Sequence, residues 1–286
     1  MVKFRVSAFS DEYSPKFDEQ IEGLLANQVH MTELRHIDEV NVSDLTLTQA
    51  SEVRRKLDAA GIGVSAIGSP IGKIQITDPM GPHLDKLRNT CEVAEIVGTD
   101  RIRMFSFYVP EGEAEKYKDE VIDRIGRMLD VADEYHVKLC HENEKGIYGE
   151  KPEQCRTILD SFPGRLGCVF DPANFVVCGC EPFEFGYELL KKDITYMHIK
   201  DATRSGTVVP AGCGIGCLPE ILALINLTRN GEFIVTVEPH LKVFSGLDKL
   251  QHGTAAIGNA YETSAEAFAA AVEALRQCIP LTAGCI

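Results

Sequence analysis

Residues 121–142, VIDRIGRMLDVADEYHVKLCHE, contain the two patterns that together decide the fold. The first part places apolar residues at helical spacing, at Val121, Ile125, Met128 and Ala132. The last six residues, VKLCHE, are a short β-branched and apolar run typical of a buried strand. A helix followed directly by such a run predicts one unit of a parallel sheet with crossover helices.

The same alternation continues along the whole chain. Segments 17–25 and 84–94 repeat the helical spacing, and the Ala-rich segment 264–278 predicts a closing helix. No Pro/Gly/Ser-rich linker or charge block divides the 286 residues, so we expect one (β/α)8 TIM barrel domain over residues 1–286. The eight predicted strands are 4–9, 30–35, 63–68, 101–107, 137–142, 166–171, 194–200 and 233–238.

Charge and apolar content exclude several classes of protein. The 29 Lys and Arg against 43 Asp and Glu give a net charge of −14, which repels phosphate backbones and anionic membranes, so we expect neither nucleic acid nor membrane as a partner. No stretch approaches the roughly 20 apolar residues of a membrane span, and the first residues resemble no export signal. We therefore expect a cytoplasmic protein whose ten cysteines are mostly reduced thiols.

Four of the later predicted strands carry, at or near their ends, a residue that can bind a metal ion: Glu142, Asp171, His198 and Glu238. In a (β/α)8 barrel the carboxyl ends of the strands form one rim, so these side chains would converge there. Asp171 alone, before Pro172, would more often be a helix cap or a surface charge than a metal ligand. Three carboxylates and one imidazole suit Mn²⁺, Mg²⁺, Co²⁺ or Zn²⁺ better than a thiolate-loving ion.

Several motifs resemble those of the xylose isomerase-like TIM barrels, a group that includes sugar phosphate isomerases and epimerases and the ketose 3-epimerases. The resemblance covers nearly the whole chain, and the late motifs carry most of it. The motifs are SPIGK (69–73), RIRMFSFY (101–108), HENEKGIYGE (141–150), DPANF (171–175), HIKDA (198–202) and VEPH (237–240).

The resemblance implies a metal site and a pair of acid–base residues. One divalent ion would be held by Glu142, Asp171, His198 and Glu238, with Mn²⁺ preferred and Mg²⁺, Co²⁺ or Zn²⁺ as alternatives. Glu142 and Glu238 would also be the catalytic pair. One departure is Ile215, where many relatives carry an acidic residue after G-x-G, which affects only the expected loop contacts to substrate.

This arrangement suits proton abstraction next to a carbonyl. A free carboxylate cannot remove such a proton at neutral pH unless a metal ion stabilises the developing cis-enediolate. We therefore expect a metal-dependent isomerase or epimerase acting on a small sugar or sugar-like substrate, with or without a phosphate. Expulsion of a β-hydroxyl from the same site would instead make the protein a dehydratase or lyase of a keto-polyol.

Three further residues are candidates for substrate binding: Lys200, Glu33 and His240. Lys200 could bind a hydroxyl or phosphate or form a structural salt bridge, and Glu33 could bind sugar hydroxyls or pair with Arg35 or another cation. His240 could contact the site indirectly or lie in a loop. His141 should point away from Glu142, because side chains alternate along a strand, and is expected to pack in the core.

Two other classes of function remain as alternatives. An endonuclease IV-like nuclease would need a trinuclear zinc site with several further histidines, and the early strand ends offer no such cluster. A non-catalytic sugar-binding barrel would be expected to lack one of the two glutamates, whereas both are present. A homo-oligomer is left open.

Overall fold

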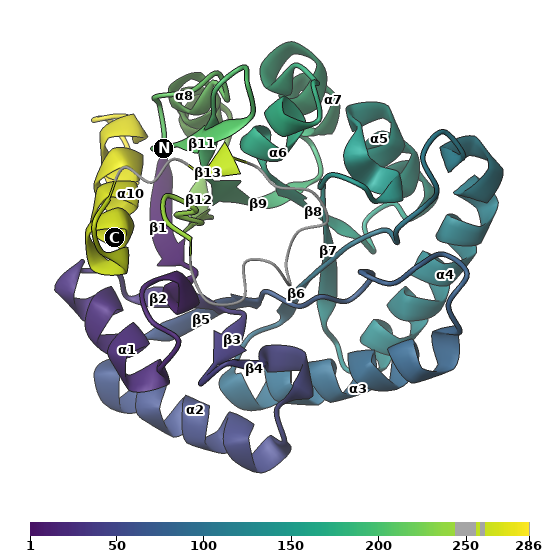
Figure 1. The fold of residues 1–286 in the computed structure, drawn as a ribbon, viewed down its shortest axis with the longest axis horizontal. Coiled ribbons are helices and arrows are strands. Elements are labelled where there is room, and N and C mark those ends of the chain that lie inside the picture. Colours follow the sequence, from purple (N-terminus) through teal and green to yellow (C-terminus); the bar gives the residue numbers. More distant parts are fainter. Residues whose placement is uncertain (244–255, 258–260, 286) are drawn as a thin grey trace.

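Eight parallel strands close into a barrel in the computed structural model, which describes residues 1–243, 256–257 and 261–285 (Figure 1). The barrel closes because β1 pairs with β12 along its whole length as well as with β2. Each of the eight predicted runs overlaps one of these strands, although β1 and β12 begin two residues before their predicted runs, so the predicted TIM barrel is confirmed. The strands are β1 (Val2–Ala8), β2 (Met31–Leu34), β5 (Gly63–Ile67), β6 (Arg101–Met104), β7 (Lys138–Glu142), β8 (Gly167–Phe170), β9 (Ile194–Ile199) and β12 (Gly231–Val237).

Helices surround the barrel and cover the outer faces of its strands (Figure 1). The spacing read from residues 121–132 is the buried face of α4, where Val121, Ile125, Met128 and Ala132 are all fully buried. The α-helices are α1 (Phe17–Ala26), α2 (Leu47–Ala60), α3 (Met80–Val97), α4 (Ala114–Glu134), α5 (Pro152–Ser161), α6 (Pro172–Val177), α7 (Glu188–Leu190), α8 (Leu218–Thr228) and α10 (Ser264–Cys278).

The predicted closing helix is α10, and its start has a clear local cause. The hydroxyl of Thr263 accepts a hydrogen bond from the backbone N–H of Glu266, and the Glu266 side chain accepts one from the backbone N–H of Thr263. This reciprocal pair satisfies two donors that a helix start would otherwise leave unpaired.

Short strands and single-turn helices lie between the barrel elements. One small hairpin follows β2, a second small sheet follows β9, and β14 adds to the beginning of β1. These elements are η1 (Ser10–Glu12), β3 (His36–Ile37), β4 (Val40–Asn41), η2 (Val42–Asp44), η3 (Tyr148–Glu150), η4 (Pro182–Tyr187), β10 (Asp201–Ala202), β11 (Thr207–Val209), β13 (Ala256–Ile257) and β14 (Gly284–Cys285).

The Gly-rich loop 212–216 folds around a single carboxylate, that of Asp201. The backbone N–H groups of Gly212 and Gly214 both donate to Asp201 Oδ2 at 3.0 Å, and that of Gly216 donates to Oδ1 at 2.8 Å. A Cβ on Gly214 would lie 2.3 Å from Asp201 Oδ1, so glycine is required there. The loop is thus a structural βα connection.

Side chains that point into the barrel form a layered interior. Cys140 and Tyr196 pack inside against Ala66 and Val169. Because side chains alternate along a strand, Glu142 and His198 lie one step nearer the carboxyl ends on the same inner face. The inner faces of β7 and β9 therefore present polar groups where the strands end.

Candidate metal centre and active site

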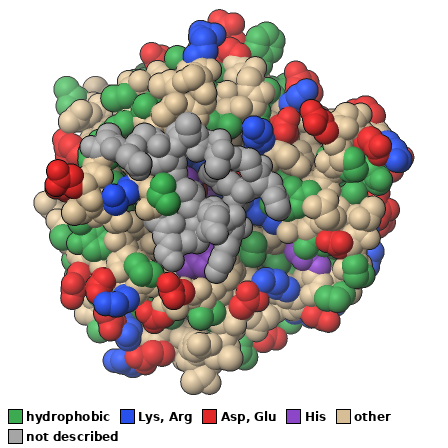
Figure 2. All heavy atoms as spheres, viewed as in Figure 1, with side chains coloured by type: hydrophobic (Ala, Val, Ile, Leu, Met, Phe, Trp, Pro, Cys, Tyr) green, Lys and Arg blue, Asp and Glu red, His purple; other side chains and the backbone are tan. Residues whose placement is uncertain are grey.

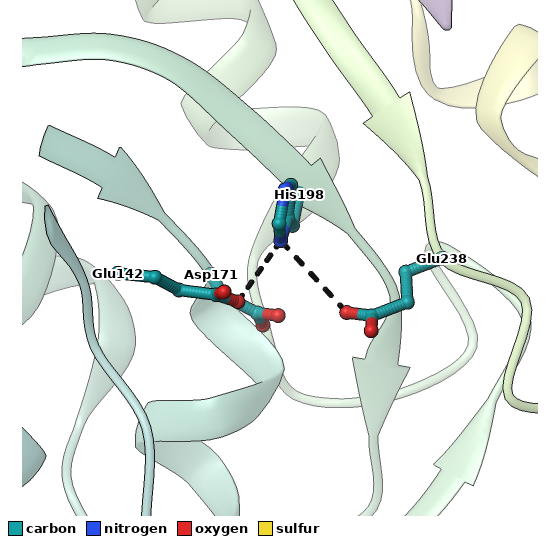
Figure 3. A group of neighbouring side chains, drawn as sticks. All are labelled: Glu142, Asp171, His198 and Glu238. Carbon is teal, nitrogen blue, oxygen red and sulfur yellow. Dashed lines mark hydrogen bonds and ion pairs between the residues drawn. The ribbon is translucent and has the colours of Figure 1, made fainter. Parts of the chain in front are cut away.

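The four residues predicted to bind a metal lie together at the carboxyl ends of the strands. Glu142 ends β7, Asp171 follows β8, His198 lies near the end of β9 and Glu238 follows β12. One potential ligand atom from each lies within 4.8 Å of all the others, and all four residues are buried. Figure 3 shows Glu142 and Glu238 on either side of His198. Barrel closure thus brings together residues almost 100 positions apart in sequence.

His198 contacts carboxylates through both ring nitrogens. Its Nδ1 lies 2.9 Å from Glu142 Oε1 and 3.9 Å from Glu238 Oε2, while its Nε2 lies 3.1 Å from Glu33 Oε2. Burial alone would lower the pKa of His198, but Glu142 and Glu33 outweigh that effect and raise its pKa to about 10. The ring thus presents Nδ1 to Glu142 and Glu238 and Nε2 to Glu33.

Glu142 is held as a carboxylate by its neighbours. Arg103 Nη1 donates to Oε2 at 3.2 Å, and Asn174 Nδ2 donates to Oε1 at 3.3 Å. Burial would raise the pKa of Glu142, but His198 and Arg103 together lower that pKa to about 2. The residue is therefore charged at neutral pH and can bind a cation.

Asp171 has a structural contact on one oxygen and faces the site with the other. Oδ1 accepts the backbone N–H of Asn174 at 3.0 Å and so caps α6, which confirms the helix-cap interpretation. Oδ2 lies 3.0 Å from Lys200 Nζ and, among the described residues, receives no well-directed hydrogen bond. Burial raises the pKa of Asp171 to about 6 although Lys200 opposes this. Capping and metal binding are thus compatible, because they use different oxygens.

Glu238 lies between two cations. Arg35 Nη1 donates to Oε1 at 3.2 Å, and Lys200 Nζ donates to Oε2 at 2.7 Å. Burial would raise the pKa of Glu238, but Lys200, His240 and other neighbours hold it well below its ordinary value. Like Glu142, it is a carboxylate at neutral pH.

The residues predicted to bind substrate have three different surroundings. Lys200 is buried and contacts Asp171 and Glu238. His240 is also buried, with its Nδ1 3.5 Å from Glu238 Oε1 and 3.1 Å from Glu12 Oε1. Its φ of +44° is rare for a residue with a side chain and is held by Glu12 Oε2, which accepts the His240 backbone N–H at 2.6 Å.

Glu33 does not have the substrate-facing surroundings that we expected from the sequence. Its carboxylate is fully buried, because Tyr196 donates to Oε1 at 3.0 Å and His198 Nε2 contacts Oε2. The Glu33 carboxylate lies deeper in the barrel than the four potential ligands and contacts the ring nitrogen of His198 that faces away from them. His141 lies outside the cluster, as expected, with its Nε2 3.0 Å from Ser106 Oγ.

Sequence reasoning missed two buried arginines. Arg103 is 4% exposed and Arg35 is 2% exposed, and each donates to one of the two glutamates. Arg35 also pairs with Asp11 and Glu12 and packs over the Phe9 ring at 4.4 Å. Both could have been recognised as charged residues within or directly after an apolar strand: Arg103 lies in RIRM (101–104) and Arg35 ends TELR (32–35).

A small cavity of about 20 Å³ lies at the barrel mouth and is lined by two of the four residues, Glu142 and Glu238. Its described lining consists of polar residues and includes four cations, and its volume suffices for about one water molecule. A larger groove of about 660 Å³ lies elsewhere on the surface, between Gln28 and Leu281, and includes none of the four residues. The lining residues of the small cavity are Arg35, Lys73, Arg103, Glu142, Glu144, Asn174, Lys200, Glu238 and His240.

Comparison with protein families agrees with this fold. The model of the xylose isomerase-like TIM barrel family matches residues 28–257, most of the chain. The chain belongs to this family. No curated protein sequence matches it significantly.

Solved structures with the same barrel include enzymes of different activity. The probable 3-DHS dehydratase AsbF of Bacillus anthracis superposes with a TM-score of 0.72 at 14% identity, covering 96% of this chain and 99% of that one. The 3-keto-D-glucoside 4-epimerase YcjR of E. coli gives 0.69 at 13% identity, covering 97% and 100%. The IOLI protein, which was crystallised with a zinc atom, gives 0.71 at 18% identity, covering 96% and 98%. At these identities the likeness concerns the fold.

Proposed function

We propose that this protein is a divalent-metal-dependent isomerase or epimerase that moves a proton next to the carbonyl of a small sugar or sugar-like substrate. The observation that carries the proposal is the buried cluster of Glu142, Asp171, His198 and Glu238, with a glutamate on either side of the imidazole (Figure 3). Epimerisation at one carbon needs a base on one face and an acid on the other. Two carboxylates flanking one centre supply both.

The donor set fits a metal ion. Three carboxylates and one imidazole nitrogen suit Mn²⁺, our preferred ion, as well as Mg²⁺, Co²⁺ or Zn²⁺. Asp171 Oδ2 is a buried anionic oxygen with only an ion-pair contact among the described residues, which is the situation of a ligand atom. A bound ion would supply Lewis-acid stabilisation of negative charge on the substrate oxygens.

The protein's own side chains would transfer the proton, position the two glutamates and bind the substrate hydroxyls. One of Glu142 and Glu238 accepts the proton from the carbon as a carboxylate. The other first takes up a proton from solvent water and then delivers a proton to the opposite face of the same carbon. Arg103 and Arg35 hold these two carboxylates in place and favour their charged form. The polar mouth, with Asn174 and Glu144, can hydrogen-bond substrate hydroxyls.

Loss of a β-hydroxyl is a second candidate reaction at the same site, favoured by the cations next to Glu238. Elimination starts with the same proton removal and then needs a proton donor for the departing hydroxyl. Lys200 Nζ and His240 Nδ1 lie 2.7 Å and 3.5 Å from Glu238 oxygens, where either could act as that donor.

A nuclease is less well supported. Among the described residues, one further group could hold a metal, Glu12, Glu238 and His240, but it shares Glu238 and both its glutamates pair with Arg35. On the described part of the face in Figure 2, basic side chains are interspersed with acidic ones and do not merge into a patch. Such a surface does not favour a phosphate backbone.

Deuterium exchange tests the proposal. With Mn²⁺ added, the wild-type protein should exchange the proton next to the carbonyl of an accepted ketose, followed by NMR over a panel of ketoses and inososes. Glu142→Gln and Glu238→Gln should each reduce turnover by at least about 10²-fold. Normal turnover in both variants would reject the assignment of the acid–base pair, and binding of substrates without any exchange would favour a non-catalytic protein.

A further inference from the structure

Lys200 lies among the residues that we propose as metal ligands. It is the second residue after His198, so it shares the inner face of the barrel, and only 6% of its side chain is exposed. Its Nζ lies 2.7 Å from Glu238 Oε2 and 3.0 Å from Asp171 Oδ2. One ammonium thus bridges two of the four proposed ligands.

The two oxygens that Lys200 contacts are those left for a metal ion. Asp171 Oδ1 accepts the backbone N–H of Asn174, and Glu238 Oε1 accepts from Arg35. The other oxygen of Glu238, Oε2, faces the centre, 3.9 Å from His198 Nδ1. Asp171 Oδ2 and Glu238 Oε2 are therefore the ligand atoms that the surrounding structure leaves available, and Lys200 holds both.

An ammonium and a divalent ion cannot both occupy this position. An ion in such a site binds carboxylate oxygens at about 2.0–2.2 Å, so Nζ would lie only a few ångströms from it. Like charges at that distance in a buried site repel each other strongly. Binding of the ion therefore requires Nζ to leave both oxygens.

We propose that Lys200 is an internal counter-cation of the metal site, whose ammonium balances Asp171 and Glu238 and is displaced when a divalent ion binds. This inference rests on the proposed function, because it needs the metal site. Lys200 also lines the cavity at the mouth beside Asn174 and Glu144. The displaced ammonium therefore remains on the substrate side, where it can donate to a substrate oxygen.

Measurement of metal affinity tests directly whether the Lys200 ammonium competes with a divalent ion. The full-length protein and Lys200→Met would be stripped with a chelator and titrated with Mn²⁺ by calorimetry. Because the variant has no competing cation, it should bind Mn²⁺ at least about tenfold more tightly than the wild type. The chelated variant should also melt at a lower temperature than the chelated wild type, and added Mn²⁺ should close most of that gap. Equal or weaker binding by Lys200→Met would overturn the proposal.

Two control variants separate competition from a general change of charge. Lys200→Arg keeps the positive charge and should bind Mn²⁺ no more tightly than the wild type. Lys73→Met removes a buried lysine at the same mouth whose ion pair is with Glu144, and its affinity should stay close to that of the wild type. If Lys73→Met tightened binding as much as Lys200→Met, the effect would be one of net charge and the proposal would fail.

A structure of the wild-type protein with Mn²⁺ provides a test that does not depend on the folding of a variant. Lys200 Nζ should then lie beyond contact distance of both Asp171 Oδ2 and Glu238 Oε2. If the ion is bound and Nζ still contacts both oxygens, the proposed displacement of Lys200 is wrong, whereas the proposed metal site is supported. If the wild-type protein binds none of Mn²⁺, Mg²⁺, Co²⁺ and Zn²⁺, the proposed function itself is wrong.

Discussion

At the scale of single residues, Glu33 shows how a buried acid can act on a site that it does not enter. Its carboxylate accepts from Tyr196 and contacts His198 Nε2. A metal-binding histidine commonly has its second nitrogen fixed by such a partner, which sets the tautomer and the direction of the ring. We therefore assign Glu33 a positioning role on His198 in place of the substrate contact expected from the sequence.

Replacing Glu33 by Gln should weaken metal binding. The neutral amide no longer fixes the proton on His198 Nε2, so Nδ1 is less available, and we expect Mn²⁺ affinity to fall by about 10–100-fold in calorimetric titration. Tyr196→Phe is the matched control, because it removes the other contact of Glu33 but keeps the carboxylate, and should bind Mn²⁺ like the wild type. Unchanged affinity in Glu33→Gln would show that His198 is oriented by other contacts.

At the scale of elements, the segment after β5 that contains Gly72 is hydrogen-bonded on one side to α3 and on the other to the segment after β6. The Gly72 N–H donates to His83 Nε2 of α3 at 2.8 Å, and its carbonyl accepts the Phe107 N–H at 2.9 Å. Gly72 has a φ of +89°, and a Cβ there would lie 2.0 Å from the Phe105 carbonyl oxygen. The segment thereby places Lys73 at the mouth, opposite Glu144.

His83 should make the stability of the protein depend on pH. Burial lowers its pKa from 6.5 to about 4, so its contribution is complete above about pH 6.5 and is lost as the pH falls toward 4. The loss is up to about 3 kcal/mol. In His83→Gln the amide oxygen can still accept from Gly72 and does not titrate. Urea unfolding at pH 7, 5.5 and 4.5 should therefore show a smaller fall in the free energy of unfolding for the variant.

A second buried histidine, His141, contributes equally to the pH dependence of the wild type and of His83→Gln. Burial also lowers the pKa of His141 to about 4, and this residue titrates in both proteins. The difference between wild type and His83→Gln therefore reports His83 alone. An identical pH dependence in the two proteins would contradict the lowered pKa of His83.

At the scale of the whole molecule, the site exists only when the barrel is closed. Its four proposed ligands come from β7, β8, β9 and β12 or the residues that follow them, and its supporting arginines come from β6 and the end of β2. Unfolding separates all of them. A metal ion that binds this cluster therefore binds the folded protein and stabilises it.

Thermal unfolding should report this linkage. Mn²⁺ at about 100 times its dissociation constant should stabilise the protein by about 2.7 kcal/mol and raise Tm by several degrees. Asp171→Asn is a suitable control, because an asparagine oxygen can still cap α6 while the charge is lost, and its shift should be much smaller. If none of the four candidate ions changed the Tm of the wild-type protein, the metal site would be rejected.

The barrel and the four candidate ligands could be predicted from the sequence because both depend on local patterns. Short apolar runs alternating with helical spacing specify strands and helices without knowledge of tertiary contacts. The position of Glu142, Asp171 and Glu238 at the ends of such runs places them on one rim once the barrel is assumed. His198 is found by the same reasoning in the unit between Asp171 and Glu238.

The surroundings of those ligands depend on contacts between distant strands, which no local pattern records. Periodicity predicts that Glu33 points inward, but only the closed barrel places it beneath His198, 165 positions away. The same closure pairs Arg35 with Glu238 and brings Lys200 onto Asp171 and Glu238. Strand alternation thus determined which residues face the interior, whereas barrel closure decided which charges meet there, because burial makes each charge depend on its nearest partners.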